Sequence, residues 1–113
     1  MSKSAQDFLS EANSVVPSIA GGEALSLITS GKAVVIDVRD GKEIDQSGTV
    51  KNALRIPRGM IEFVADPTTS FYNDQISNDK EILVICGAGG MAALTGKTLM
   101  EMGYTTVHNV GGF

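Results

Sequence analysis

The chain has 113 residues, a formal net charge of −4, one cysteine and one histidine. This length is typical of one domain and suffices for a hydrophobic core without disulfide or metal cross-links. A single cysteine excludes an intramolecular disulfide, and Cys86 with His108 supplies too few ligands for a structural zinc site. We therefore expect one domain over residues 1–113 that needs no metal and no cofactor.

The charge pattern argues against some classes of binding partner, and the lack of long apolar segments argues against a membrane or secreted location. The acidic balance and the scattered lysines argue against nucleic acid, because binding to a phosphate backbone requires clustered cations. No apolar segment approaches the roughly 20 residues needed to span a bilayer. The polar first residues lack the apolar region of a secretory signal. We expect a cytoplasmic protein that binds neither nucleic acid nor membranes and keeps its thiol reduced.

The first part of the chain predicts two helices joined by a short extended segment. Apolar residues at helical spacing predict a helix over residues 2–15, and Pro17 ends it because the residue before a proline avoids the helical region. Residues 17–20 are expected to be extended. A second helix is predicted over residues 22–30, with no side-chain cap at its start and with Gly31 after its end.

A buried strand is predicted next. Residues 33–38, AVVIDV, are rich in β-branched side chains and do not alternate, which is typical of a strand buried on both faces. Asp40 is expected to cap a short helix over residues 40–46. A short strand over residues 53–56, a helix over 59–65 and a polar surface loop over 66–78 follow.

The last part of the chain repeats the alternation. Residues 81–85, EILVI, predict a second buried strand, residues 91–102 a helix ended by Gly103, and residues 106–110 a short last strand. Because strands and helices alternate throughout, the expected fold class is α/β with a mainly parallel sheet.

Cys86 stands at the junction of the second buried strand and a glycine-rich turn. Glycine is 13 of 113 residues, about twice its usual share, and Gly87, Gly89 and Gly90 follow the cysteine. Ligands of open α/β sheets bind at the carboxyl ends of strands. Turn N–H groups and a helix N-terminus stabilise negative charge, and the thiolate is the nucleophilic form of cysteine. A buried cysteine is also a common core residue, but a core position needs no glycine turn after it, so we interpret Cys86 as a nucleophile.

The turn does not match the common phosphate-binding motifs. It lacks the GxxxxGK[ST] pattern of a P-loop, and GxGxxG does not fit residues 87–92. A cysteine-dependent phosphatase would need an arginine after five intervening residues to hold the phosphoryl oxygens, and Ala92 occupies that position. Phosphatase chemistry is therefore disfavoured.

Six short segments form an ordered set along the chain. They are VVIDVRD at 34–40, GTVKNA at 48–53, ALRIP at 53–57, the six-residue loop at 86–91, EMGY at 101–104 and NVGGF at 109–113. This set resembles the D-V-R segment, the GHIPGA turn, the A-x-x-I-P segment, the active-site loop, the helix end and the N-x-x-GGF pattern of single-domain rhodaneses, a family of sulfurtransferases. The resemblance covers the chain from about residue 19 to its end.

The resemblance implies a fold and a reaction. The fold would be a three-layer α/β/α domain with a five-stranded sheet in the order 3-2-4-5-1, and residues 1–17 would be an N-terminal helical extension. The Cys86 thiolate would take sulfane sulfur from a donor such as thiosulfate, form a persulfide, and pass the sulfur to a thiol, on a small molecule or a protein, or to cyanide. Rhodaneses usually continue with a helix after GGF, so ending at Phe113 leaves either an uncovered edge or a shortened chain.

The backbone of the loop would bind the substrate. The residues concerned are Gly87, Ala88, Gly89, Gly90 and Met91. Met91 stands where many rhodaneses carry an arginine, so the loop lacks charge-assisted hydrogen bonds to an anionic donor, each about 1.5–3 kcal/mol. We expect weaker use of thiosulfate. Arg58, at a strand end on the side of Cys86, is the candidate to replace this cation, and the alternative is a solvated surface arginine.

Three further residues are expected to have structural roles. Asp37 and Arg39 lie two residues apart on one face of a buried strand, and an internal ion pair would offset the cost of burying the carboxylate. Nothing in the sequence places His108 near the loop, so we do not expect it to act as a base for Cys86. The alternative to a sulfurtransferase is a non-catalytic rhodanese-like module that binds a partner or senses oxidants, which the missing loop arginine would suit.

Overall fold

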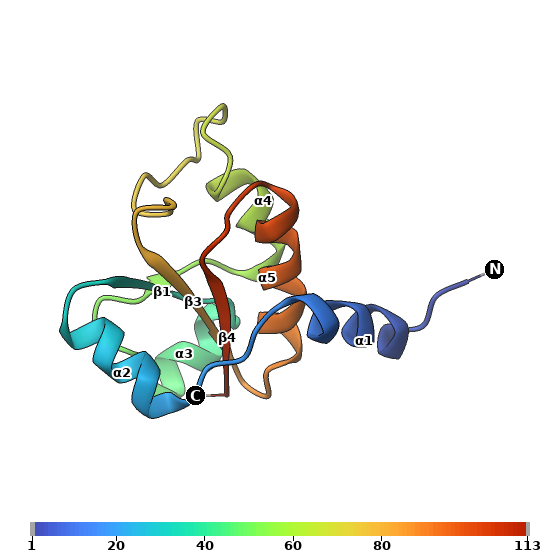
Figure 1. Ribbon diagram of the computed structural model, residues 1–113, viewed down its shortest axis with the longest axis horizontal. Coiled ribbons are helices and arrows are strands. Elements are labelled where there is room, and N and C mark those ends of the chain that lie inside the picture. The colour runs from blue at the N-terminus through green and yellow to red at the C-terminus, as the bar shows by residue number, and fades with distance from the viewer. Residues whose placement is uncertain (1, 113) are drawn as a thin grey trace.

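A parallel four-stranded sheet forms the centre of the fold in the computed structural model, which describes residues 2–112 (Figure 1). The strands are β1 (Ala33–Asp37), β2 (Leu54–Arg55), β3 (Glu81–Cys86) and β4 (Val107–Gly112), in the order β2-β1-β3-β4. All three neighbouring pairs are parallel. The two central strands are the apolar runs that do not alternate, and they are buried as that pattern predicted.

The expected five-stranded sheet is wrong, because residues 17–20 do not form a strand. Ser18 makes one isolated bridge to Asn109 at the outer edge of β4, where the first strand of the order 3-2-4-5-1 was expected. Two backbone hydrogen bonds join these segments. The Ile19 N–H donates to the Asn109 carbonyl (3.1 Å), and the Asn109 N–H donates to the Pro17 carbonyl (2.9 Å). Pro17 has no N–H to donate to a ladder, and pairing with β4 is limited to the single bridge at Ser18.

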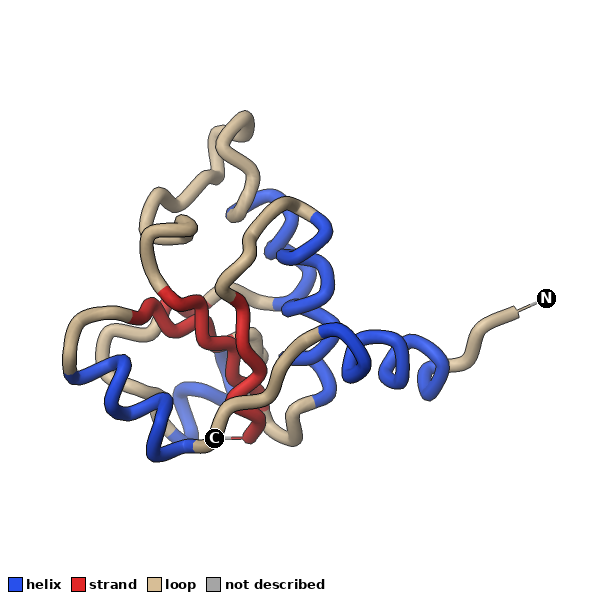
Figure 2. Tube along the Cα trace, in the orientation of Figure 1, coloured by secondary structure: helices blue, strands red, loops and turns tan. Residues whose placement is uncertain are grey.

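Within the described residues, five α-helices lie around the sheet, as Figure 2 illustrates. They are α1 (Ala5–Val15), α2 (Gly21–Thr29), α3 (Gly41–Ser47), α4 (Ile61–Val64), which follows a 3-10 turn η1 (Arg58–Met60), and α5 (Gly90–Glu101). Asp40 caps α3 by accepting the Lys42 N–H (3.1 Å), as predicted, and α2 begins without a side-chain cap. α1 begins with a capping box in which Ser4 and Asp7 accept each other's backbone N–H. The long segment between α4 and β3 is irregular, as expected from its polar sequence.

Helices cover both faces of the sheet, so the fold has three layers (Figures 1 and 2). On one face, Ile36 and Cys86 belong to the larger core cluster with Ile61 of α4 and Leu99 of α5. On the other face the smaller core cluster joins the neighbouring strand residues to α2. Its buried members are Ala24, Val35, Leu83 and Ile85.

The first helix packs along α5 (Figure 1). Gly96 of α5 faces the Val16 side chain so closely that a Cβ built on the glycine would lie 2.8 Å from the valine Cγ1. Gly90, at the start of α5, is close to Leu9 in the same way, at 3.4 Å. α1 therefore contacts both the middle of α5 and the end that follows the glycine-rich turn.

The last strand is longer than the sequence predicted. β4 continues to Gly112 because a register shift opposite Val84 and Ile85, with Gly111 at φ 95°, lets the glycines stay paired with β3. Gly112 is then paired with Cys86, so the end of β4 lies directly beside the cysteine. Phe113, the end of the N-x-x-GGF pattern, lies outside the described residues. None of the helices within residues 2–112 is long and apolar enough to cross a membrane.

Candidate active site

The Cys86 sulfur lies at the N-terminus of α5, at the carboxyl end of β3. It accepts the Gly89 N–H at 2.9 Å and the Ala92 N–H at 3.4 Å, and the side chain is 1% exposed. Gly89, the N-cap residue of α5, has no side chain to satisfy these N–H groups. The sulfur therefore does what a serine or aspartate oxygen does at an ordinary helix start. Negative charge on the sulfur is stabilised by the same two N–H groups and by the helix dipole.

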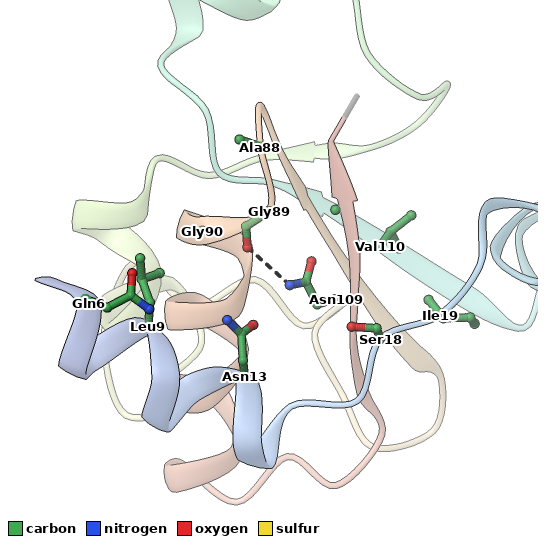
Figure 3. Close-up of a pocket in the computed structure, with 11 residues that line it drawn as sticks. Gln6, Leu9, Asn13, Ser18, Ile19, Ala88, Gly89, Gly90, Asn109 and Val110 are labelled. Atoms are coloured by element: carbon green, nitrogen blue, oxygen red, sulfur yellow. Dashed lines mark hydrogen bonds between the residues drawn. The ribbon is translucent and has the colours of Figure 1, made fainter.

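The turn that supplies these N–H groups is fixed by its backbone. Gly89 has φ 91°, a left-handed conformation that favours glycine. Its carbonyl accepts the Ala93 N–H (3.0 Å) and the Nδ2 of Asn109 (3.1 Å), and Figure 3 shows the Asn109 side chain directed at Gly89. Asn109 thereby ties β4 to the turn that carries the sulfur ligands. The sequence singled it out only as part of the NVGGF pattern.

Two further glycines are required because backbone and side chains approach closely. A Cβ on Gly112 would lie 2.6 Å from the carbonyl oxygen of Gly87, so the turn and the end of β4 pack backbone against backbone. A Cβ on Gly87 would lie 3.3 Å from the Glu43 Oε2. A carboxylate from α3 therefore lies beside the residue that follows the cysteine.

Four N–H groups of the turn remain available to a substrate. Within residues 2–112, the N–H groups of Gly87, Ala88, Gly90 and Met91 donate to no protein group. Gly87 and Ala88 are also exposed. The predicted loop residues, 87–91, thus follow Cys86 in one turn, and what they offer is almost entirely backbone.

Met91 and Arg58 lie beside one depression, but the arginine is engaged elsewhere. The Arg58 guanidinium donates to Glu62 (3.1 Å) and to the Thr98 hydroxyl (3.0 Å). Thr98 is about two helical turns beyond Met91 on α5. Met91 is 40% exposed. The depression that both residues line also includes Gly90, so Arg58 is near the loop while its charge is matched by Glu62.

Asp37 and Arg39 form a buried ion pair under the site. The guanidinium donates to both carboxylate oxygens, at 2.8–3.2 Å, and the Arg39 N–H donates to one of them at 3.1 Å. The Thr49 hydroxyl donates to the same carboxylate at 2.6 Å. Burial by itself raises the pKa of Asp37, but the hydrogen bonds from Arg39 and Thr49 outweigh it and hold this pKa below its ordinary value. Thr49, the second residue of the GTVKNA segment, is thus part of this network.

The other end of the Arg39 side chain joins the same network to α3. Its guanidinium donates to the Ser47 hydroxyl and to the Gly48 carbonyl, each at 2.8 Å. It also lies 3.6 Å from the Glu43 carboxylate. The hydrogen bond to Asp37 raises the pKa of Arg39, with the two carboxylates adding to the effect and burial opposing it. Arg39 therefore holds α3 and its carboxylate next to the turn and is itself neutralised.

His108 is far from the sulfur. It pairs with Leu83 on β3, three residues before Cys86, and its Nε2 lies 3.4 Å from the Glu81 Oε1. Three residues along a strand span roughly 10 Å. Within the described residues, no three His, Cys, Asp or Glu side chains lie close enough together to hold a metal ion.

These features define an α/β protein whose central strand ends in a cysteine held by the N–H groups of a glycine turn. The model of the family "Rhodanese-like domain" matches residues 21–113, and the chain belongs to this family. The match begins after α1. A search of the curated proteins found no match.

Solved structures agree with this assignment. A Rhodopseudomonas palustris protein of unknown function, described as a possible tyrosine phosphatase, superposes with a TM-score of 0.90 at 33% identity, over 100% of this chain and 88% of its own. The human single-domain sulfurtransferase TSTD1 has a TM-score of 0.72 at 27% identity, over 86% of this chain and 90% of its own. A rhodanese-related protein of Thermoplasma volcanium, with a TM-score of 0.65 at 24% identity over 85% and 84% of the two chains, shares the fold.

Proposed function

We propose that this protein is a sulfurtransferase in which Cys86 carries sulfur as a persulfide. The Cys86 thiolate attacks the outer sulfur of a donor such as thiosulfate, the S–S bond of the donor breaks, and sulfite leaves with the bonding electron pair. A thiolate, on a small molecule or a protein, or cyanide then attacks the outer sulfur of the persulfide and releases the Cys86 thiolate. A cytoplasmic setting, which the single cysteine favours, would keep the enzyme reduced between turnovers.

The position of the sulfur carries this proposal. Cys86 Sγ accepts two N–H groups, and four more in the same turn have no partner among residues 2–112. This arrangement suits a group that alternates between thiolate and persulfide anion, because backbone dipoles stabilise either form without moving. The similarity to the human single-domain sulfurtransferase supports the same reaction class.

We expect a dianionic donor to be a poor substrate, because the described side chains beside the turn supply little unmatched positive charge. Met91 contributes no charge, Arg58 is paired with Glu62, and the carboxylate of Glu43 lies beside Gly87. Replacing Met91 by arginine should therefore raise kcat/KM for thiosulfate about 10- to 100-fold, the equivalent of one charge-assisted hydrogen bond of about 1.5–3 kcal/mol. Met91→Gln, of similar length and without charge, is the matched control, and an equal gain in both variants would contradict this explanation.

The decisive experiment is mass spectrometry of the intact protein after incubation with sulfane-sulfur donors. One added sulfur atom on wild type, removed by cyanide and absent in Cys86→Ser, is the expected result. Circular dichroism of the variant shows whether the fold is kept. If no donor adds sulfur to the folded wild-type protein, the transfer reaction is wrong and the non-catalytic rhodanese-like module takes its place.

Phosphatase chemistry is the competing reaction, since one structural neighbour is described as a possible tyrosine phosphatase. The position that would need a phosphate-binding arginine is Ala92, which is fully buried and donates its N–H to the cysteine sulfur. The methyl group of Ala92 offers no donor to a phosphoryl oxygen. We expect no hydrolysis of an aryl phosphate above that of Cys86→Ser.

A further inference from the structure

A depression of about 610 Å³ lies between α1 and α5 and reaches the glycine turn. Its apolar lining consists of Ala5, Phe8, Leu9, Met91 and Leu94. Phe8 is 49% exposed and Met91 40% exposed, so two large apolar side chains face solvent at one place. This volume is within the range of about 300–1,000 Å³ that small-molecule sites occupy.

The charged groups around this depression are already paired. Arg58 lies 3.1 Å from the Glu62 carboxylate, and Lys97 lies 2.9 Å from the Glu101 carboxylate. The hydrogen bond to Glu101 raises the pKa of Lys97, so the pair stays charged and matched. An inorganic anion gains little from matched pairs, whereas an apolar group gains by covering Phe8 and Met91.

The depression is joined to the cysteine through the residues that follow it. Gly90 and Met91 line it, and they lie between Gly89 and Ala92, whose N–H groups hold the Cys86 sulfur. Its other wall is α1, which lies outside the residues matched by the family model. Leu9 of α1 packs against Gly90, so this wall stands directly at the turn.

We infer that this depression binds the organic group of an alkyl or aryl sulfane-sulfur donor and directs its sulfur to Cys86, an inference that rests on the sulfurtransferase function proposed above. Alkane thiosulfonates, R–SO2–S⁻, represent this class. The Cys86 thiolate attacks the terminal sulfur, the S–S bond breaks, and the alkane sulfinate leaves with the bonding electron pair. The sulfur becomes the outer atom of the Cys86 persulfide, and the step needs no oxidant or reductant.

A series of donors that differ only in chain length tests the inference. Methane, propane and hexane thiosulfonate carry the same charge and the same reacting group. A fully buried methylene would raise kcat/KM about fourfold, and we expect about twofold for each methylene in this open depression. The five added methylenes should therefore raise kcat/KM about 30-fold from methane to hexane thiosulfonate. Ala5→Trp, which fills the depression, should reduce this ratio to below about fivefold. Ser14→Trp, an exposed position on the opposite face of α1, is the matched control and should keep the ratio.

The two proposals fail in different ways. If methane thiosulfonate adds sulfur to Cys86 but the ratio stays near one, or if Ala5→Trp leaves the ratio unchanged, the binding inference is overturned and sulfur transfer stands. If no donor adds sulfur, titration calorimetry with Cys86→Ser still measures binding. There, hexane thiosulfonate is expected to bind about 30-fold more tightly than methane thiosulfonate, and equal binding would overturn the inference.

Discussion

Replacing Gly96 by alanine tests whether α1 is an integral part of the domain. A Cβ at this position would lie 2.8 Å and 3.2 Å from the two methyl carbons of Val16 and 3.4 Å from a methyl carbon of Val107. Carbon atoms pack best at about 3.5–4.0 Å, so Val16 must withdraw by about 0.7 Å or more. Val16 is 4% exposed and follows α1, so this withdrawal has to separate α1 from α5.

The net cost follows from two opposing effects. Inserting a methyl group into a packed contact costs about 1–3 kcal/mol. Alanine is the better helix former by up to about 1 kcal/mol. We expect Gly96→Ala to lose about 1 kcal/mol of unfolding free energy, equivalent to a Tm lower by about 4 °C in a domain of this size. Gly22→Ala in α2, where a Cβ meets nothing within 4 Å, is the control and should not destabilise.

A double-mutant cycle with Val16→Ala gives the sharper result. Val16→Ala alone leaves a cavity and destabilises. The alanine at position 96 should then partly fill this space, so the double variant should be more stable than the sum of the single effects by about 1–2 kcal/mol. Urea unfolding followed by circular dichroism on the four proteins measures this coupling. Additivity to within about 0.5 kcal/mol, or a stabilised Gly96→Ala, would refute the packing of α1 on α5.

Three further substitutions test other contacts. Thr49→Val removes a hydrogen bond to the buried Asp37 carboxylate and should cost about 1.5 kcal/mol by urea unfolding at neutral pH, whereas Thr49→Ser should cost less. The pKa of Asp37 is held below its ordinary 3.8. The stabilisation by the Thr49 hydrogen bond is therefore present above pH 3.8 and is lost as the pH falls through the lowered pKa, so the difference in unfolding free energy between Thr49→Val and wild type should shrink at low pH. Tyr104→Phe leaves a buried carbonyl without its 2.6 Å donor and should cost about 1–3 kcal/mol, more than Tyr72→Phe, because Tyr72 is only partly buried and its hydrogen bond is longer, at 3.2 Å. Glu43→Gln should raise kcat/KM for thiosulfate about two- to fivefold, and an unchanged value would show that this carboxylate does not act on the donor.

The central strands and the cysteine turn were predictable because their signals are local. An apolar run without alternation identifies a strand buried on both faces, and both such runs became central strands. Asp40 capped its helix because capping depends on the next few residues only. Residues 17–20 are extended beside β4, as predicted, but they do not form the fifth strand that the resemblance implied, because Pro17 cannot donate to a ladder and only Ser18 forms a bridge.

The supporting residues of the site were missed because their contacts span the chain. Asn109 contacts a turn 20 residues earlier, and Thr49 contacts Asp37 from the opposite side of α3. Neither separation along the sequence corresponds to a helix or strand period, so no sequence pattern predicts these contacts. The pairing of Arg58 is different, because Glu62 follows it at i+4 and this spacing on a helix is a recognised ion pair. The sequence therefore already contained, in Glu62, a partner for the Arg58 guanidinium.

The proposed reaction places an anionic sulfur in an acidic protein. Arg39 is matched by Asp37 and Glu43, and Arg58 by Glu62, so the side chains near the turn contribute little net positive charge. The stabilisation then has to come from backbone N–H groups and from the N-terminus of α5, whose dipoles are fixed and short in range. Such a site holds one charge on the cysteine sulfur well and a second charge on the donor poorly. If the proposed sulfur transfer is correct, a donor that replaces the second charge by an apolar group should therefore be a better substrate than thiosulfate.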